Sequence, residues 1–431
     1  MSGVEIGVLI LSFLLLLTLG VPITVSISLS ALFTLSVSIL FIPATTTVAQ
    51  RMINGLDSFT LLAIPFFILA GQIMNTGGIA SRLISFAKEI VGPIRGGLVF
   101  VNIISCTLFG AISGSAAAAA SAIGSILTGK MEKEGYDKGF TTAANITSAT
   151  SGLLVPPSNV LIVYSLAAGG LSIGALFVAG YVPGLLLSLA IMVVSYIYAV
   201  KKKYPKGNSW NVKRLLKSFL AALPGLFLLV LVMGGIIGGY FTATEASAIA
   251  VLYTLILSLV YKELTVDSLR KTLIQSSLTT SIVLLLVATS SAMSWTMSYG
   301  DLPRSISDSL LSFTDNPVVV LILINVLLLL VGVFMDITPA ILIFTPIFLP
   351  VVQTFGINPI HFGIIMVLNL CIGLCTPPVG NLLFVGATVA NISFQKILRP
   401  MLPLYAIMLV VLVLIMLFPQ LSLWLPSLFA M

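Results

Sequence analysis

The chain contains very little charge. Charged residues make up 8% of its 431 residues, against about 25% in an ordinary soluble domain. This scarcity excludes a water-soluble fold. The formal net charge of +7 could suggest a nucleic-acid binder. We expect no such partner, because basic residues of membrane proteins gather in cytoplasmic loops for topological reasons.

Residues that carry much enzyme chemistry are equally scarce. The only histidine is His361, so neither a histidine dyad nor a zinc-binding HExxH motif can form. Residues 124–131 (GSILTGKM) nearly match a phosphate-binding loop, but the lysine is followed by Met and no strand precedes the segment. The cysteines lie in apolar segments without metal-type spacing. The sequence therefore predicts neither enzymatic activity nor a cofactor.

Long apolar runs are abundant instead. Hydrophobic residues make up 58% of the chain, and a membrane-spanning helix needs about 20 predominantly apolar residues. We predict one all-α polytopic membrane domain with ten crossings. We interpret the first run as a retained helix, because Glu5 stands where a signal peptide has basic residues. The predicted crossings are residues 4–20, 22–42, 59–75, 137–170, 171–200, 222–241, 243–261, 278–298, 361–391 and 400–418.

Two further apolar regions are interrupted at their centres. Residues 96–128 are split by Ser-Gly-Ser at 113–115, and residues 316–350 are split by MDITP at 335–339. Each half is too short to be a confident crossing. Such segments are tolerated at membrane depth only when they are buried in protein or line a wet cavity. We therefore predict two re-entrant hairpins.

Basic residues predict the orientation. With ten crossings and the N-terminus outside, eighteen Lys and Arg residues fall on one side and only Arg51 and Arg304 on the other. Because the cytoplasmic side of membrane proteins carries the excess of basic residues, the side with eighteen is predicted to be cytoplasmic. The N-terminus is then periplasmic in a bacterial inner-membrane protein.

The second half of the chain repeats landmarks of the first at an offset of about 221 residues. Gly110 falls on Gly332, Asn102 falls close to Asn325, and GLLVPP at 152–157 falls on GLCTPP. Each half is predicted to hold five crossings and one hairpin. Because five is odd, the second half enters the membrane upside down, which is the inverted-repeat architecture of secondary transporters.

This repeat divides the chain into three parts. Residues 1–200 form the first repeat and residues 222–431 form the second. Between them, residues 201–221 are predicted to form a cytoplasmic linker and an amphipathic interfacial helix.

Each repeat contains two consecutive prolines inside a long apolar segment, at 137–170 and 361–391. Two prolines remove two backbone donors and disturb the preceding turn, so carbonyl groups become free of the helix. A desolvated Na⁺ is a good partner for such oxygens. The alternative is a proline kink satisfied by neighbouring helices. The occurrence of both breaks at matching positions favours an ion site.

The hairpin tips offer further ligands. Ser113 and Ser115 place two hydroxyl groups around Gly114, which also suits close helix packing. Asp336 is an acid predicted deep in the membrane, where ionisable groups are functional candidates. Its alternative role is to cap the following helix, together with Thr338.

Two other polar residues receive structural interpretations. Glu245 follows Thr242 at a predicted helix start, so we expect it to cap that helix. His361 lies near Pro359 at another helix start and is expected to be interfacial rather than a proton carrier.

Several motifs together resemble the large membrane subunit of tripartite ATP-independent periplasmic (TRAP) transporters. They are NGLDSFTLLAIPFFILAGQIMNTGGIASRLISFA (54–87), SGSAAAAASAIGSI (113–126), EGYDKGFTTAANITSATSGLLVPPSN (134–159), MDITPAILIFTPIFLPV (335–351) and TPPVG (376–380). The resemblance covers essentially the whole chain. It implies an inverted-repeat elevator-type transporter with two re-entrant hairpins and two broken helices.

The resemblance also implies function and partners. The chain would belong to a Na⁺-driven importer of small carboxylates, such as C4-dicarboxylates, sialic acid or other sugar acids. It would lie in the lipid bilayer beside a small four-helix membrane subunit, and a periplasmic substrate-binding protein would deliver the substrate.

Individual roles follow from the same resemblance. The first Na⁺ site would contain Ser113, Gly114, Ser115, Gly152 and Pro156. The second would contain Gly332, Asp336, Thr338, Gly373 and Thr376. The substrate would contact Ser158, Asn159, Pro378 and Asn381. The binding protein would dock near Arg51, Asp57, Asp301 and Arg304, for which a purely topological role is the alternative.

Two other functions stay open at this point. A stand-alone Na⁺/carboxylate symporter of related fold would need no binding protein. A channel is disfavoured, because a single inverted-repeat chain offers no symmetric ring of filter groups. The sequence does not identify the substrate.

Overall fold

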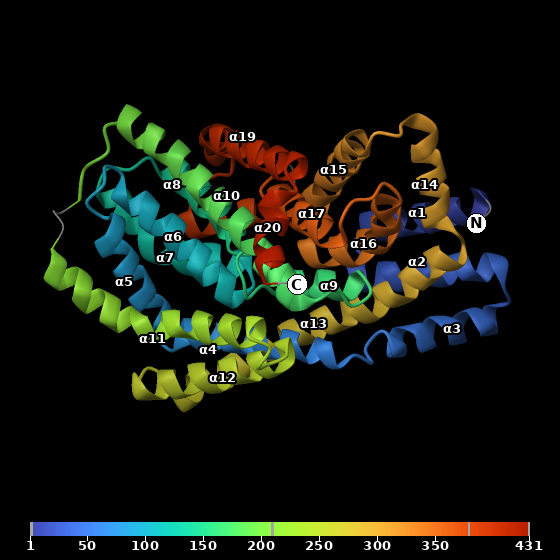
Figure 1. The fold of residues 1–431 in the computed structure, drawn as a ribbon, viewed down its shortest axis with the longest axis horizontal. Helices are drawn as coiled ribbons and strands as arrows, with labels where there is room; N and C mark the ends of the chain where they lie inside the picture. Colours follow the sequence, from blue (N-terminus) through green and yellow to red (C-terminus); the bar gives the residue numbers. More distant parts are fainter. Residues whose placement is uncertain (1–2, 208–210, 378–379, 430–431) are drawn as a thin grey trace.

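The computed structural model describes residues 3–207, 211–377 and 380–429, and within these ranges every named element is a helix (Figure 1). The elements of the first half are α1 (Gly3–Thr18), α2 (Ile23–Ser38), α3 (Phe41–Asn54), η1 (Phe59–Leu62), α4 (Ala63–Thr76), α5 (Ile79–Val91), α6 (Gly97–Ser113), α7 (Ala116–Lys133), α8 (Lys138–Ser151), α9 (Asn159–Ala167) and α10 (Ile173–Lys201). Those of the second half are α11 (Val212–Ile237), α12 (Ala243–Val260), α13 (Val266–Tyr299), α14 (Leu302–Phe313), α15 (Pro317–Phe334), α16 (Ile337–Thr354), α17 (Pro359–Gly373), α18 (Asn381–Ala390), α19 (Gln395–Leu417) and α20 (Gln420–Leu428). The prediction of an all-α fold is confirmed.

Membrane-spanning helices are plentiful. Among the described residues, eight helical segments are long and apolar enough to cross a bilayer: η1 with α4, α10, α11, α12, α13, α15, α16 and α19. The eight include α15 and α16, which we predicted as hairpin arms. They omit the short helices α1 and α2 and the two broken helices. Length and composition therefore do not separate a hairpin arm from a crossing.

The helices pack in two groups. The framework helices, which we define as α1–α5 with η1 and α11–α13, pack on one another chiefly through α4 on α12, α5 on α11, and α13 on α2, α3 and α4. The core helices, which we define as α6–α10 and α15–α20, include the pairs α6–α8, α7–α18, α15–α17 and α8–α19. The groups meet where α5 contacts α6, where α13 contacts α16, and where α4 contacts α6 and α9 (Figure 1).

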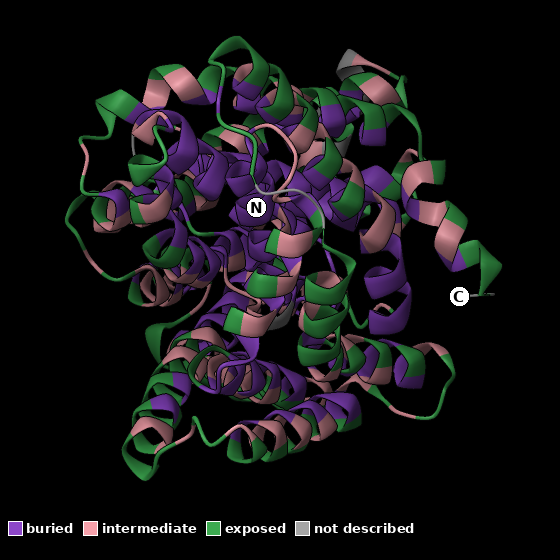
Figure 2. Ribbon diagram, turned by 90° about the vertical axis from the view of Figure 1, so that its left-hand side faces the viewer, coloured by how far each residue is buried: buried purple, intermediate pink, exposed green. Residues whose placement is uncertain are grey.

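Burial agrees with this grouping. Every residue of α8 from Gly139 and of α17 from His361 is buried, so these two core helices are enclosed by protein on all sides. Large apolar side chains such as Leu189, Val230 and Leu252 are exposed on outer faces, which suits contact with lipid rather than water (Figure 2). The structure is therefore that of a multi-pass membrane protein.

Two helix pairs occur where the hairpins were predicted. Helices α6 and α7 are joined through Gly114, which has the left-handed φ of +61°, and through Ser115, whose hydroxyl accepts a hydrogen bond from Ala118 N at 3.2 Å. Helices α15 and α16 are joined through Met335 and Asp336. In both pairs a polar side chain caps the second helix, because its first backbone N–H groups have no partner within the helix.

The broken helices also occur at the predicted positions. Helix α8 ends at Ser151 and α9 begins at Asn159, so the proline pair lies in the gap. Helix α17 ends at Gly373 and α18 begins at Asn381. Each gap interrupts the regular hydrogen bonding of a buried helix, as proline residues without a backbone N–H require.

A glycine contact joins each hairpin to a broken helix, and it recurs in both halves. A Cβ atom added to Gly152 would lie 2.6 Å from the Cα of Gly110, and one added to Gly373 would lie 2.6 Å from the Cα of Gly332. Real Cβ atoms do not approach so closely, so only glycine lets these backbones touch. The glycines that the sequence offset paired thus make equivalent contacts.

The predicted interfacial helix at 201–221 is wrong in its boundary. Helix α11 begins at Val212, where Asn211 accepts a hydrogen bond from Arg214 N, and continues without interruption to Ile237. The amphipathic segment is therefore the first part of a spanning helix rather than a separate element. Nothing between Val212 and Leu223 breaks the helix, since this stretch contains neither Gly nor Pro.

Two smaller interpretations have opposite outcomes. The cap predicted for Glu245 is confirmed, because Thr242 N donates to the carboxylate at 2.7 Å and the Thr242 hydroxyl accepts from Glu245 N. The interfacial placement of His361 is wrong. Its side chain is buried in the protein, with Nδ1 3.3 Å from the Ser422 hydroxyl, because α20 folds back over the start of α17.

The glycine contacts give a stability prediction. Replacing Gly152 or Gly373 with Ala forces two backbones apart, so we expect a loss of about 1–3 kcal/mol in the free energy of unfolding. Thermal unfolding of the purified protein in detergent measures this loss. Gly129→Ala is the matched control, because an added Cβ there meets nothing within 4 Å and Ala favours the helix. Equal melting temperatures for all three variants would contradict the close contact.

Candidate functional site

A cavity of about 790 Å³ lies between the core helices and the framework helices. Both hairpin tips and the starts of α9 and α18 line its core side. Residues of α2, α4 and α13 line its framework side. Seven sequence-distant parts of the chain thus meet in one place, and a volume of this size suits a small organic ligand.

Four core helices place their N-terminal residues in the lining of this cavity, and α2 does the same from the framework side. The lining includes Ala116–Ala118 of α7, Asn159 of α9, residues 337–339 of α16, and Asn381 with Leu382 of α18. Each N-terminus carries unpaired N–H groups and a partial positive charge. Their convergence gives the cavity a positive potential without a basic side chain, since none of the described lining residues is Lys or Arg.

The first hairpin tip lies directly against the first break. A Cβ on Gly114 would lie 2.4 Å from Asn159 Nδ2, so the tip packs on the asparagine that begins α9. The buried Oδ1 atom of Asn159 has no hydrogen-bond partner among the described residues. Ser113 and Ser115 line the same wall. An orphaned carbonyl-type oxygen beside two hydroxyls is the kind of oxygen set that a hard cation prefers.

The second tip places a carboxylate on the opposite side. Asp336 lines the cavity together with Thr338, and its Oδ1 accepts a hydrogen bond from Ile337 N at 2.7 Å. The cap interpretation of Asp336 is therefore confirmed. The same side chain remains available to the cavity, because a carboxylate has further lone pairs.

Most of the other predicted ion-site residues support the site without lining the cavity. Gly152, Gly332 and Gly373 form the backbone contacts described above and do not line the cavity. Pro156 is buried within the first break. The Thr376 hydroxyl lies 2.8 Å from the Ile372 carbonyl and 2.9 Å from the Tyr405 hydroxyl. These residues hold the breaks in shape rather than face the open space.

The predicted substrate contacts also divide into residues that line the cavity and residues that do not. Asn159 and Asn381 line the cavity, each at the first position of a half-helix. Ser158 is buried, and its hydroxyl donates to the Leu153 carbonyl. That bond satisfies one of the carbonyls freed by the prolines from within the break itself, whereas the proline-kink alternative expected neighbouring helices to do so. Pro378 lies outside the described residues.

The framework side supplies polar residues that the sequence analysis missed: Thr24, Gln72, Gln275 and Thr279. Gln72 lies within the 54–87 motif, but no role was assigned to it, and the other three lie in helices outside the quoted motifs. An uncharged amide within an apolar run was the one signal that could have indicated them, since such groups rarely face lipid.

The chain matches the family model described as the tripartite ATP-independent periplasmic transporter, DctM component, over residues 10–421. It belongs to this family. It is therefore a TRAP large permease subunit, and the resemblance inferred from its motifs is confirmed.

Individual relatives agree. The YgiK protein of Salmonella typhimurium is 55% identical over 97% of this chain and 96% of its own length. The sialic acid TRAP transporter large permease protein SiaM of Vibrio cholerae is 41% identical over 88% of this chain and 89% of its own length. The solved YdaH transporter of Alcanivorax borkumensis has a TM-score of 0.65 at 13% identity, covering 87% of this chain and 88% of YdaH. That likeness shows a shared fold only.

The four residues predicted for docking do not form one cluster in this TRAP subunit. Arg51 stacks on Trp295, with its guanidinium carbon 4.7 Å from the ring centre. Asp57 is exposed in the connection that follows α3. Asp301 and Arg304 line a separate surface cavity of about 420 Å³. The structure thus brings two of the four together.

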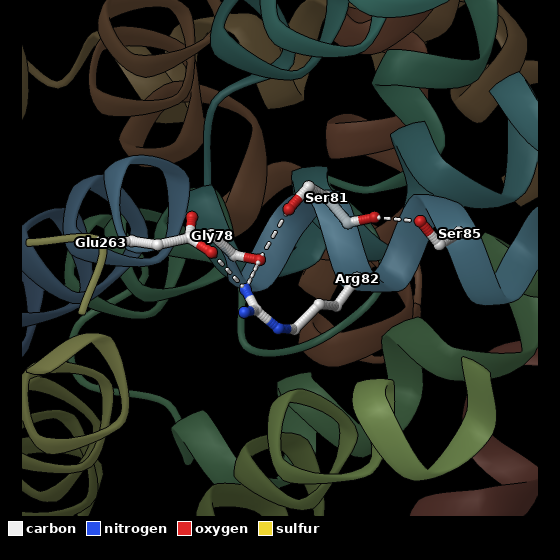
Figure 3. Close-up of polar contacts among 5 residues, drawn as sticks. All are labelled: Gly78, Ser81, Arg82, Ser85 and Glu263. Atoms are coloured by element: carbon white, nitrogen blue, oxygen red, sulfur yellow. Dashed lines mark hydrogen bonds and ion pairs between the residues drawn. The ribbon is translucent and has the colours of Figure 1, made fainter. Parts of the chain in front are cut away.

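A group of contacts around Arg82 joins two connections of the framework near the cavity. Figure 3 shows Arg82 of α5 donating to Glu263 Oε1 at 2.9 Å and to the Gly78 carbonyl at 2.7 Å. The guanidinium also lies 3.7 Å from the ring centre of Tyr261. We call the contacts of Arg82 with Glu263, Gly78 and Tyr261 the Arg82 clasp. It joins the turn after α4 to the connection before α13, the two helices that carry Gln72 and Gln275.

The clasp gives a second stability prediction. Arg82→Glu removes the ion pair and the stacking on Tyr261, so we expect a lower melting temperature. The combined Arg82→Glu and Glu263→Arg variant should recover about 0.5 kcal/mol, a small value because the side chains are 27% and 42% exposed.

Reversal of the Asp267–Lys271 pair is the matched control. These side chains are 71% and 76% exposed, so their reversal should leave the melting temperature unchanged. An Arg82→Glu variant that melts at the same temperature as the unmodified protein would show that the Arg82 contacts do not stabilise the framework.

Proposed function

We propose that this TRAP permease subunit imports small carboxylates with Na⁺ as the coupling ion, after delivery by a periplasmic binding protein. The convergence of four helix N-termini on one cavity carries the proposal. A carboxylate needs positive potential, and the described lining residues include no Lys or Arg to supply it. Helix N-termini and bound Na⁺ would supply it together.

The repeated breaks suit two ion sites. The first would use oxygens at the Ser113–Ser115 tip and the break before Asn159. The second would use Asp336, Thr338 and the break after Gly373. Binding of cation and anion would then stabilise each other, because each neutralises charge next to the other in a low-dielectric space. This couples the ion gradient to the substrate without a group that changes protonation.

Movement of the core helices against the framework would expose the cavity alternately to the two sides. The cavity ends on the framework near Gln72 and Gln275, close along the chain to Arg82 and Lys271. The distribution of basic residues predicts that this side is cytoplasmic. In this proposal the structure is inward-facing.

The partners follow from the same proposal. A small four-helix membrane subunit would pack on exposed apolar framework helices, and the binding protein would dock on the periplasmic side near Arg51, Asp57, Asp301 and Arg304. Substrate choice among dicarboxylates, sialic acid and other sugar acids would then rest largely with the binding protein.

Uptake into proteoliposomes tests the proposal. Vesicles would contain this chain and its small subunit, and labelled carboxylates would be offered with and without an inward Na⁺ gradient and the binding protein. We expect uptake only when both are present. Uptake with Na⁺ alone would indicate a stand-alone symporter, and uptake independent of Na⁺ would contradict the ion sites.

Asp336→Asn separates Na⁺ coupling from proton coupling. Asn keeps an oxygen that can cap α16 but removes the negative charge, so we expect the Na⁺ concentration for half-maximal uptake to rise about tenfold. The pH dependence of uptake should stay that of the unmodified chain. A pH profile that changes with the substitution would indicate a proton carried by Asp336. Asp267→Asn serves as the charge-matched control, because Asp267 is 71% exposed and lines neither this cavity nor the cavity beside Asp301 and Arg304.

A further inference from the structure

A second cavity, of about 360 Å³, lies between the framework and the core further along α13. Its framework wall consists of Gly55, Ser58 and three serines of α13, Ser290, Ser291 and Ser294. Its core wall includes the turn at Gly169–Gly170 and Leu342 with Pro346 of α16. Four hydroxyl groups thus gather where the two groups of helices face each other.

One of these hydroxyls has no partner. The Ser290 side chain is 2% exposed, and its Oγ makes no hydrogen bond to any described residue. Serines inside helices usually bond the carbonyl one turn earlier, as Ser281 does with Ser277 at 2.8 Å. A buried hydroxyl without a partner costs free energy, and a hydrogen bond to a ligand in this cavity would recover it.

The two cavities share one helix. The α13 residues that line the first cavity end at Leu286, and those that line the second begin at Val287. Between the polar ends lies an apolar stretch that includes Ile282, Val283 and Leu286. Helix α13 therefore presents a polar, an apolar and again a polar segment to the core helices.

The polar segments lie on the same face. Thr279 and Ser290 are eleven residues apart, which is close to three turns of 3.6 residues. At 1.5 Å per residue, the two hydroxyls are separated by about 16 Å along the helix axis. A core that slid by about this distance would carry the hairpin tips from the first polar segment to the second.

We propose that Ser58, Ser290, Ser291 and Ser294 form the framework contact for the substrate in the outward-facing state, which replaces the contact with Gln72, Gln275 and Thr279. This inference rests on the proposed function. Hydroxyl groups donate hydrogen bonds to the oxygens of a carboxylate or a sugar acid and carry no charge that would hold the anion back. The apolar stretch between the segments offers the anion no such partner. The anion therefore binds more favourably at the two polar end positions than between them.

The test measures initial uptake at a subsaturating concentration of substrate-loaded binding protein. Ser290→Ala with Ser294→Ala should lower the rate about tenfold, the effect of losing one hydrogen bond to a charged group. Ser277→Ala with Ser281→Ala is the matched control, because these serines lie on the same helix, are exposed and line neither cavity. The control should transport at the unmodified rate.

A labelling experiment checks the same contact without relying on rates. A membrane-impermeant thiol reagent is added from the binding-protein side to vesicles carrying Ser294→Cys or, as the control, Tyr240→Cys, which lies in the turn after α11 and is 81% exposed. The native cysteines are buried. Saturating substrate and Na⁺ should change the labelling rate at position 294 at least threefold and leave the labelling rate at position 240 unchanged.

The outcomes separate this inference from the proposed function. Uptake by the double alanine variant within about twofold of the unmodified chain, or an equal loss in the control, would overturn the external contact. Labelling at position 294 that ignores substrate would overturn it as well. If the unmodified chain shows no uptake that depends on Na⁺ and binding protein, the proposed function itself fails.

Discussion

Everything in this structure depends on interrupting helices in the middle of a membrane. A helix satisfies its own internal N–H and C=O groups, but the breaks between α8 and α9 and between α17 and α18 replace the regular ladder with irregular backbone hydrogen bonds, such as Leu153 N to the Thr150 carbonyl at 3.1 Å and Gly380 N to the Thr376 carbonyl at 3.0 Å. Each unpaired group in hydrocarbon costs several kcal/mol, so the breaks must be enclosed by protein or face a polar space. Both solutions are present. The Leu153 carbonyl receives the Ser158 hydroxyl, while Asn159 and Asn381 begin half-helices at the cavity.

Enclosure requires unusually close packing, and small residues make it possible. The hairpins reach the breaks only because Gly110 meets Gly152 and Gly332 meets Gly373 without side chains between them. The tip at Gly114 then packs against the side chain of Asn159. Without these contacts the N-termini of α7 and α16 would not converge with those of α9 and α18. The positive potential of the cavity is therefore a consequence of backbone packing, not of any basic residue.

The sequence predicted the parts of this arrangement that contain residues unusual in an apolar helix. Consecutive prolines, a Ser-Gly-Ser tip and an acid in an apolar run have few structural explanations, so the hairpins, the breaks, Asp336 and Asn159 could be predicted before the fold. Gln72 and Gln275 obey local rules, because Gln is a good helix former. Their role depends on which helix face meets the cavity, and that is set by tertiary packing. The start of α11 was missed for a similar reason, since amphipathic character does not tell where a continuous helix enters the membrane.

The contrast between the two groups of helices has a mechanical meaning. The core is built from short half-helices and hairpins, whereas α13 runs for 34 residues without a single Gly or Pro. A helix of that composition lacks the residues that most often kink helices. It is anchored by contacts with α2, α3 and α4 and tied to α5 by the Arg82 clasp. In the proposed mechanism, a continuous, anchored helix with polar segments at two heights suits a sliding core as its partner, because the distance between the two end positions stays constant as long as the helix keeps its shape.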